Sequence, residues 1–351
     1  MQPSFHIPIS SPIVAVNKHF SMNESHKVVV HQSAQALLYC GDNFRLMKQT
    51  VDELYRVFST ITGVTIDQLN CGKEKSIPST NAILTAIAAH CLLEMKRTAV
   101  FLRGINKAIK LKISEAAGRP VCILYAGTGP YGTLVIPLLR LFKPEELIID
   151  LLDINSDSLA ALQKVTDALT LNRYIGEVYC ADATTFVVTK PYDIVISETM
   201  LACLKSEPQV AIMQNLVPQL TESCLFIPEE ISIDAFLTNP KLETDRLFHS
   251  GTEPLPFERR LMENVFKVSK LNTMLSRKKL FVPCCITSFP VLKLFTTVKV
   301  FGNEILTGND SSITMPKQYF DFRKQSATEV VFWYVQGKKP RIESHVVQQT
   351  L

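Results

Sequence analysis

The stretch Val121-Cys-Ile-Leu-Tyr-Ala-Gly-Thr-Gly-Pro-Tyr-Gly132 decides the fold of this chain. Its apolar beginning predicts a short buried strand, and Gly127, Gly129 and Gly132 follow at the spacing G-x-G-x-x-G. Glycines at this spacing permit a tight turn and let a ligand approach the backbone beside the start of a helix. A turn without a ligand is the alternative for the motif taken alone. We call residues 126–132 the glycine loop.

Short apolar runs alternate with helical patterns around and after this loop. The expected strands are 121–125, 147–152, 177–180 and 192–196, and the expected helices run from the glycine loop to 141 and over 156–171. Such alternation indicates a parallel sheet with crossover helices, which is an α/β fold. We assign residues 116–227 to this nucleotide-binding domain.

The segments on either side have different patterns. In residues 1–115, apolar positions recur at steps of three and four over 33–60 and 79–113, with a loop at 70–78, so this domain is expected to be helical. Residues 228–351 contain the β-type runs 231–237, 285–289, 292–301 and 330–335 and are expected to form a sandwich or barrel. The helical domain carries more apolar surface than a lead-in helix needs, so we expect it to form a dimer interface.

The composition of the chain argues against nucleic-acid binding, a metal site and membrane insertion. The chain has 351 residues, 46% of them hydrophobic and 20% charged, and its net charge of +4 includes no long basic run that would follow a nucleic acid. Nine cysteines occur without a Cys-x-x-Cys or a histidine at ligand spacing, so no metal site is expected and the thiols are interpreted as reduced. The amino terminus lacks the pattern of a signal peptide and no apolar run could span a bilayer, so we expect a cytoplasmic protein without membrane contact.

Two aspartates follow expected strands and extend the argument for a nucleotide. Asp153 ends the second strand, where an acid accepts hydrogen bonds from ribose hydroxyls. Asp182 follows the third strand and is placed to hold an adenine amino group, with a helix cap as the alternative. A nicotinamide dinucleotide and S-adenosylmethionine both satisfy this pattern.

Two glutamates favour the second of these cofactors. Glu198 and Glu207 lie in the stretch Ser197-Glu-Thr-Met-Leu-Ala-Cys-Leu-Lys-Ser-Glu207, directly after the expected strand 192–196. Carboxylates at the end of a buried strand are costly to desolvate unless a cation meets them, and the planar fork of a guanidinium matches a carboxylate. The pair therefore predicts a clamp for a guanidine, although each glutamate has a helix-capping acid as its alternative. We call residues 198–207 the glutamate loop.

With two further segments, Met95-Lys-Arg-Thr-Ala-Val-Phe101 and Ser344-His-Val-Val-Gln348, the chain resembles the protein arginine methyltransferases. The resemblance covers roughly residue 92 to the end, and its specific part is the double glutamate. It implies a class I S-adenosylmethionine-dependent methyltransferase (Rossmann-like) domain between a helical amino-terminal domain and a β-barrel-like carboxyl-terminal domain. It also implies that the chain is a dimer.

The resemblance also implies roles for particular residues. Arg97 would contact the methionine carboxylate of the cofactor, with an exposed helix charge as the alternative. The glycine loop, Asp153 and Asp182 would bind the rest of the cofactor, and Glu198 and Glu207 would hold the substrate. His345, in a degenerate form of the family's Thr-His-Trp loop with Val346 in place of the tryptophan, would accept the proton, with a surface histidine as the alternative.

The sequence thus predicts an N-methyltransferase that acts on a guanidinium group, in free arginine or in a peptide. A small-molecule N- or O-methyltransferase and a catalytically degenerate cofactor-binding module are the alternatives. An oxidoreductase has only the glycine loop and Asp153 in its favour.

Overall fold

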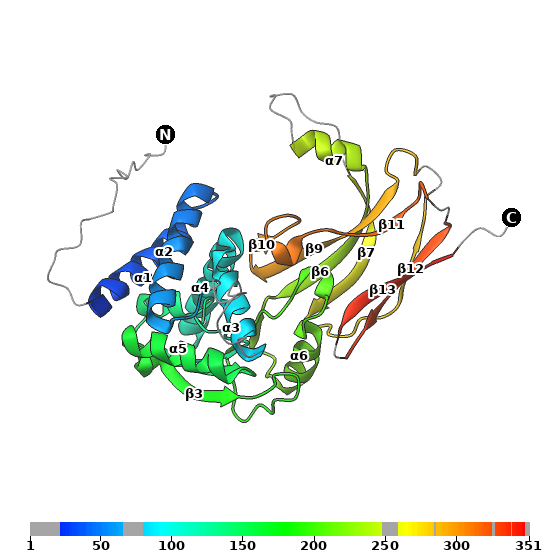
Figure 1. Cartoon of the computed structure of the whole chain (residues 1–351). Helices are drawn as coiled ribbons and strands as arrows, with labels where there is room; N and C mark the ends of the chain where they lie inside the picture. The colour runs from blue at the N-terminus through cyan, green and yellow to red at the C-terminus, as the bar shows by residue number, and fades with distance from the viewer. Residues whose placement is uncertain are drawn as a thin grey trace, which may run out of the picture.

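The computed structural model describes residues 22–65, 80–247, 259–283, 286–324, 327–337 and 339–347. Helices and a parallel sheet form one side of the molecule, antiparallel strands form the other, and helix α7 projects from the second side (Figure 1). The amino-terminal residues considered for a signal peptide, the expected loop at 70–78 and Gln348 lie outside the described residues.

Each of the two long helices expected in the first third is interrupted. The helical elements are α1 (Met22–Tyr39), α2 (Phe44–Thr62), α3 (Thr80–His90), the 3-10 turn η2 (Cys91–Leu93) and α4 (Met95–Glu115). Asn43 ends the first interruption, where its side chain accepts a hydrogen bond from the N–H of Leu46 at 3.0 Å and caps α2. The apolar periodicity continues across both breaks, so it could not reveal them.

The middle of the chain forms a five-stranded sheet in the order β3-β2-β1-β4-β5, with every pair parallel. The strands are β1 (Val121–Ala126), β2 (Leu147–Asp153), β3 (Ile175–Cys180), β4 (Ile194–Ser197) and β5 (Leu225–Ile227). Strand β1 pairs with β2 on one side and with β4 on the other, so the chain changes direction across the sheet at β1. Ligands of open α/β sheets bind beyond the carboxyl ends of the strands at such a switch point.

The connections of this sheet are α5 (Ser156–Ala168), α6 (Gln209–Leu216) and the 3-10 turns η3 (Ile136–Leu141), η4 (Asn172–Tyr174), η5 (Ala202–Leu204) and η6 (Val217–Gln219). The helix expected between the glycine loop and Leu141 is wrong, because η3 stands in its place. Pro130 and Pro137 account for the difference, since proline has no N–H to donate within an α-helix.

The last third consists of antiparallel sheets. One has the order β10-β9-β6-β7 with β11 also paired to β9, and the other has the order β13-β12-β8. The strands are β6 (Glu230–Thr238), β7 (Arg259–Ser269), β8 (Lys278–Phe281), β9 (Val291–Phe301), β10 (Glu304–Leu306), β11 (Lys317–Asp321), β12 (Glu329–Val335) and β13 (Arg341–Val347). Helix α7 (Pro240–Leu247) follows β6, and the 3-10 turn η7 (Ser312–Thr314) precedes β11.

One strand expected in this third is wrong. Residues 286–289 form a turn, and Cys285 lies outside the described residues. Pro283 and Pro290 bracket the segment, and proline cannot donate to a strand ladder.

Three further observations concern the described residues. None of their helices is long and apolar enough to cross a membrane. No group of three or more histidine, cysteine, aspartate or glutamate side chains among them is placed to hold a metal ion. The described cysteines, which are Cys40, Cys91, Cys122, Cys180, Cys203 and Cys224, are free thiols.

Candidate functional site

Polar residues from three strands and one helix gather at the carboxyl edge of the parallel sheet. The glycine loop follows β1, Asp153 ends β2, and Glu198 follows β4. Arg97 lies in the first turn of α4, which packs against β1 of this sheet and against β9 and β10 of the antiparallel sheet. The site thus lies where the helical, α/β and β-rich parts meet.

The glycine loop passes close to the glutamate loop. Gly127 has a φ of +79°, and a Cβ there would lie 2.5 Å from Cγ2 of Thr199. Only glycine fits this position without displacing Thr199. Gly129 has a φ of +59°, and the only heavy atom found near its Cβ position among the described residues is Cβ of Ala88, at 3.5 Å, from α3. A side chain at Gly129 would therefore meet α3, and the other described residues leave that position clear.

Asp153 binds the glycine loop through hydrogen bonds. Its Oδ2 accepts hydrogen bonds from the N–H of Gly129 at 2.9 Å and from the hydroxyl of Thr128 at 3.3 Å. Its Oδ1 accepts from the N–H of Asn155 at 2.9 Å, and the side chain is buried. The acid predicted to meet a ribose is thus in contact with the loop predicted to meet the same ligand.

Asp182 lies at the same edge of the sheet but in a different setting. The N–H of the preceding Ala181 donates to the carbonyl of Asp153 at 3.1 Å. The exposed carboxylate of Asp182 accepts from the N–H and the hydroxyl of Thr184 at 2.8 and 2.7 Å. It caps a turn, and no helix follows among the described residues before β4, so the helix cap of the alternative interpretation is not formed.

A buried ion pair joins two of the predicted site residues. Nη2 of Arg97 contacts Oε2 of Glu198, although the residues lie 101 positions apart. The side chains are 10% and 1% exposed, so water screens the pair little. Nη1 of Arg97 lies 3.4 Å from Oε2 of Glu94, which precedes the same helix. Arg97 is therefore not the exposed helix charge of the alternative interpretation.

Glu207 completes the acidic group. Burial raises the pKa of its carboxyl, and the positive charge of Arg97 opposes that rise. Among the described residues the Glu207 carboxylate has no recorded hydrogen bond or ion pair. Glu207 is thus a partly buried acid whose charge interacts with that of Arg97. It is free to bind a ligand.

The backbone of the glutamate loop is strained. Cys203, Leu204 and Ser206 have φ values of +58°, +54° and +68°. Residues other than glycine rarely adopt this region of backbone conformation. Each such residue costs about 1–3 kcal/mol and persists only where its surroundings hold it, which is a common property of functional sites.

Two strands of the β-rich part, and the residue before a third strand, hold this backbone in place. The N–H of Cys203 donates to Oγ1 of Thr296 in β9 at 2.9 Å. The hydroxyl of Tyr334 in β12 donates to the carbonyl of Leu204 at 3.1 Å. The N–H of Ser206 donates to the carbonyl of Pro340, just before β13, at 2.7 Å. The β-rich domain therefore shapes the loop that carries both glutamates.

Gln209 is a residue that the sequence analysis missed. It is fully buried at the start of α6, and its Oε1 accepts from the N–H of Thr199 at 2.8 Å while its Nε2 donates to the carbonyl of Ser197 at 3.1 Å. These bonds fix the backbone on both sides of Glu198. No local signal distinguished it, because Gln214 and Asn215 of the same helix are also polar.

His345 is not brought to the glutamates. The loop expected there is strand β13, in which His345 pairs with Val331 and is exposed. Five residues of extended chain, about 16 Å at the usual rise of a strand, separate it from Pro340, which does contact the glutamate loop. The β-branched Val346 and Val347 favour a strand over a loop here. This position gives no support to a role in proton transfer.

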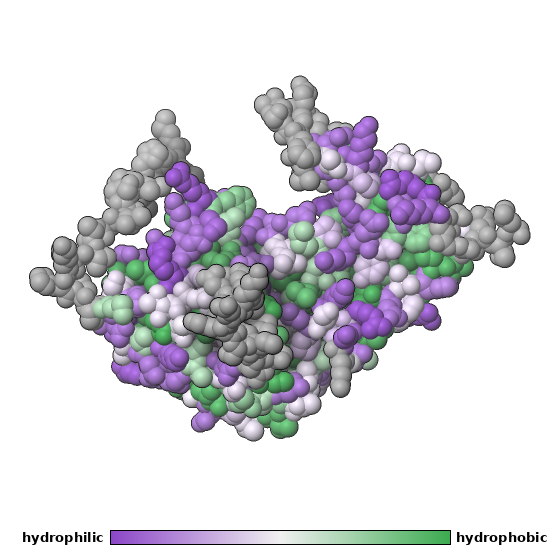
Figure 2. All heavy atoms as spheres, viewed as in Figure 1, coloured by the Kyte–Doolittle hydropathy of each residue, from purple (hydrophilic) through white to green (hydrophobic). Residues whose placement is uncertain are grey.

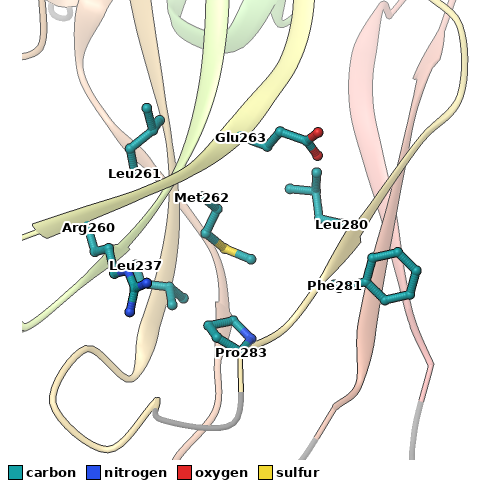
Figure 3. A pocket seen from close by; sticks show the side chains of 8 residues that line it. All are labelled: Leu237, Arg260, Leu261, Met262, Glu263, Leu280, Phe281 and Pro283. Carbon is teal, nitrogen blue, oxygen red and sulfur yellow. The ribbon is translucent and has the colours of Figure 1, made fainter.

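A pocket of about 270 Å³ lies elsewhere, between β7 and β8. Met262 of β7 and Leu280 of β8 are among the side chains that line it (Figure 3). The carboxylate in its lining, Glu263, is paired with Lys278 at 3.0 Å. None of the predicted site residues lines this pocket, so we keep the carboxyl edge of the parallel sheet as the candidate site.

Comparison with known proteins establishes the fold. No protein-family model matches the chain, and no curated protein matches its sequence. Among solved structures, the chain is similar to one from Trypanosoma brucei described as a PRMT1 enzyme-prozyme heterotetrameric complex with AdoHcy. The match has a TM-score of 0.50 and 13% identity, and it covers 75% of this chain and 93% of that one. The predicted fold class, a Rossmann-like α/β domain followed by a barrel-like β domain, is confirmed.

Proposed function

We propose that the chain is an S-adenosylmethionine-dependent N-methyltransferase that acts on a guanidinium group, in free arginine or in a peptide. One observation carries the proposal: the first glutamate of the predicted clamp is buried beside the glycine loop and already holds a guanidinium, that of Arg97. The likeness to a methyltransferase structure that contains AdoHcy supports the choice of cofactor.

The residues at the edge of the sheet fit this cofactor. The partly exposed Gly129, which has no side chain, suits a ligand that must approach the main chain closely. Asp153 is placed to accept hydrogen bonds from ribose hydroxyls, and Arg97 offers a buried guanidinium to the carboxylate of the methionine part. Asp182, which is exposed at the same edge of the sheet, would accept a hydrogen bond from the adenine amino group.

The charge of the site favours a cationic substrate. Three carboxylates, those of Glu94, Glu198 and Glu207, surround the single guanidinium of Arg97, which leaves an excess of negative charge when all are ionised. Buried charge is stable only when it is paired, so the site favours cationic ligands over neutral ones. A guanidinium adds a positive charge and the planar set of donors that two carboxylates can share.

S-adenosylmethionine supplies an electrophilic methyl group when it is bound. Glu198 and Glu207 would hold the guanidinium by charge-assisted hydrogen bonds, draw its positive charge toward themselves and leave one nitrogen more nucleophilic. Fixed orientation of that nitrogen lowers the barrier by as much as about 7–11 kcal/mol in favourable cases. We propose that Glu207 accepts the proton that the methylated nitrogen releases. A carboxyl with a raised pKa is a better base near neutral pH.

The test is transfer of labelled methyl from S-adenosylmethionine to L-arginine and to an arginine-containing peptide. We expect Glu198→Gln to abolish transfer while S-adenosylhomocysteine still binds. Transfer to a compound without a guanidinium would favour the small-molecule methyltransferase, and cofactor binding without transfer would favour the binding module. Failure of S-adenosylmethionine to bind would contradict the proposal.

We also infer that the chain forms a homodimer through its helical part. Tyr39 and Phe44, around the turn between α1 and α2, and Leu84 and Ile87 of α3 are exposed apolar side chains. Hydrophilic residues cover the projecting α7, whereas hydrophobic residues are interspersed over the rest of the visible face (Figure 2). The similar solved structure is itself part of a heterotetrameric complex. Light scattering at micromolar concentration should give twice the chain mass, and a monomer mass would contradict the inference.

A further inference from the structure

The carboxylate that is proposed to bind a substrate guanidinium is occupied by a guanidinium of the chain itself. Oε2 of Glu198 contacts Arg97, and Oε1 lies 3.4 Å from the N–H of Met200. Glu198 thus has one partner on each oxygen, and its side chain is 1% exposed. In this arrangement a second guanidinium at Glu198 would have to share an oxygen with Arg97 or with the N–H of Met200.

We propose that Arg97 and Glu198 form an internal lock on the substrate site, which a carboxylate on the bound nucleotide opens by taking Arg97 in exchange. The inference rests on the proposed function and adds a rule to it: the guanidine binds after the nucleotide, and only after a nucleotide that carries a carboxylate.

Electrostatics require the exchange to be coupled. If Arg97 left Glu198 it would keep only Glu94, at 3.4 Å, and a weakly paired buried guanidinium is destabilising, so Arg97 leaves Glu198 when another anion replaces it. A substrate guanidinium that entered while Arg97 still held Glu198 would place two like charges against one carboxylate. Arrival of a new carboxylate keeps Arg97 paired and leaves Glu198 as a buried anion that needs a new cation, so the substrate guanidinium binds next.

Glu94 keeps Arg97 in place during the exchange. Its Oε2 lies 3.4 Å from Nη1 of Arg97, and its Oε1 accepts from the N–H of Ser312 at 3.3 Å. Arg97 is therefore held on one side by Glu94 while its other side changes partner. The helix that carries Arg97 need not move, since the exchange involves the end of a long side chain.

The first test uses the wild-type protein and two nucleotides that differ in one group. S-adenosylhomocysteine carries the amino-acid carboxylate, whereas 5′-methylthioadenosine has the same adenosine and thioether without it. Calorimetry would measure binding of L-arginine and of an arginine-containing peptide to the protein alone and with each nucleotide at saturation. We expect the guanidine to bind at least about fivefold more tightly with S-adenosylhomocysteine, the lower end of typical coupling, and to gain nothing from methylthioadenosine. Equal binding in all three conditions would overturn the lock.

The second test does not depend on the substrate. Glu198→Gln frees Arg97 in advance, so this variant should bind S-adenosylhomocysteine several-fold more tightly than the wild type and methylthioadenosine equally well. Glu304→Gln is the matched control, since it breaks another ion pair of α4, with Arg103 at 2.9 Å, and should leave both affinities unchanged. Weaker or unchanged binding of S-adenosylhomocysteine to Glu198→Gln would refute the exchange.

Failure of the proposed function and failure of the lock give different results. If neither nucleotide binds to the wild type, the proposed cofactor is wrong and the lock is refuted with it. If both nucleotides bind with the affinities expected but no guanidine does, the exchange stands and the substrate assignment fails. If Glu198→Gln does not fold, Arg97→Gln replaces it: this variant should bind the guanidine without any nucleotide, and the lock is wrong if it does not.

Discussion

The hydroxyl of Tyr334 donates a hydrogen bond to the carbonyl of Leu204 at 3.1 Å, across 130 positions of sequence. Leu204 has a φ of +54°, and its carbonyl lies within the loop that joins Glu198 to Glu207. One bond from the β-rich part therefore supports a strained turn in the α/β part. Burial raises the pKa of Tyr334 to about 12, so the hydroxyl remains a donor at physiological pH.

Tyr334→Phe should separate activity from stability. Loss of one hydrogen bond lowers the free energy of unfolding by about 0.5–1.5 kcal/mol, whereas a looser glutamate loop should reduce kcat by about tenfold, equivalent to about 1.4 kcal/mol. Tyr174→Phe is the control, because it removes a comparable bond to the carbonyl of Phe142 at 2.8 Å, away from the site. Equal kcat values for the two variants would show that Tyr334 has no positioning role.

Gln209→Met should impair both folding and turnover. The substitution keeps the size of the side chain but leaves the N–H of Thr199 and the carbonyl of Ser197 without their partner. Each unsatisfied buried group costs about 1–3 kcal/mol. Gln214→Met on the same helix removes a bond to the carbonyl of Thr273 at 2.9 Å and serves as the control. We expect denaturant unfolding to show the larger loss for Gln209→Met, together with a lower kcat only in that variant.

Gly129→Ala should weaken nucleotide binding beyond its effect on stability. Gly129 and Gly118 both have positive φ, +59° and +87°, so alanine at either position costs about 1–2 kcal/mol. Gly118 has no recorded neighbour within 4 Å of its Cβ position and does not belong to the site, so Gly118→Ala measures the backbone cost alone. Only Gly129→Ala should reduce the affinity for S-adenosylhomocysteine, by about tenfold or more. Equal affinities would mean that no ligand approaches the backbone at Gly129.

Four of the five parallel strands were predicted, and β5 was not; β1 and β2 were the clearest, because strands buried on both faces have continuous apolar runs. The acids that follow such strands were predictable for the same reason: Asp153 and Glu198 mark where the apolar run stops. The breaks between α1 and α2 and before α4 were not, because the apolar period continues across them. The 3-10 turn after the glycine loop was indicated by Pro137, whose effect on a helix the motif interpretation overlooked.

Contacts across the chain were beyond the reach of local patterns. The Arg97 and Glu198 pair and the bond from Tyr334 join segments more than a hundred positions apart. Gln209 acts on backbone groups, and any residue type offers those, so its partners leave no trace in the sequence. The short segment around His345 resembled a loop motif, but its β-branched neighbours pair with β12 instead.

The raised pKa of Glu207 makes a prediction about pH. Because burial raises the pKa of this carboxyl above its ordinary 4.5, the folded protein holds the proton more tightly than the unfolded chain does. The contribution of Glu207 to stability is therefore fully present below the unfolded pKa and is lost as the pH rises through the folded pKa. Glu207→Gln, which is neutral at every pH, should melt above the wild type at pH 8 and together with it near pH 4.

The protonation state of the Glu207 carboxyl should also control turnover. Protonated Glu207 neither attracts a guanidinium nor accepts a proton, so kcat/KM of the wild type should fall on acidification with a midpoint above 4.5.

Glu145→Gln is the control for the stability experiment, because this exposed acid pairs only with Arg173 among the described residues and should show no such pH-dependent difference in melting. A Glu207→Gln variant that is less stable than the wild type at pH 8 would mean that Glu207 has a stabilising cation in solution, and the free carboxylate on which its proposed role depends would be ruled out.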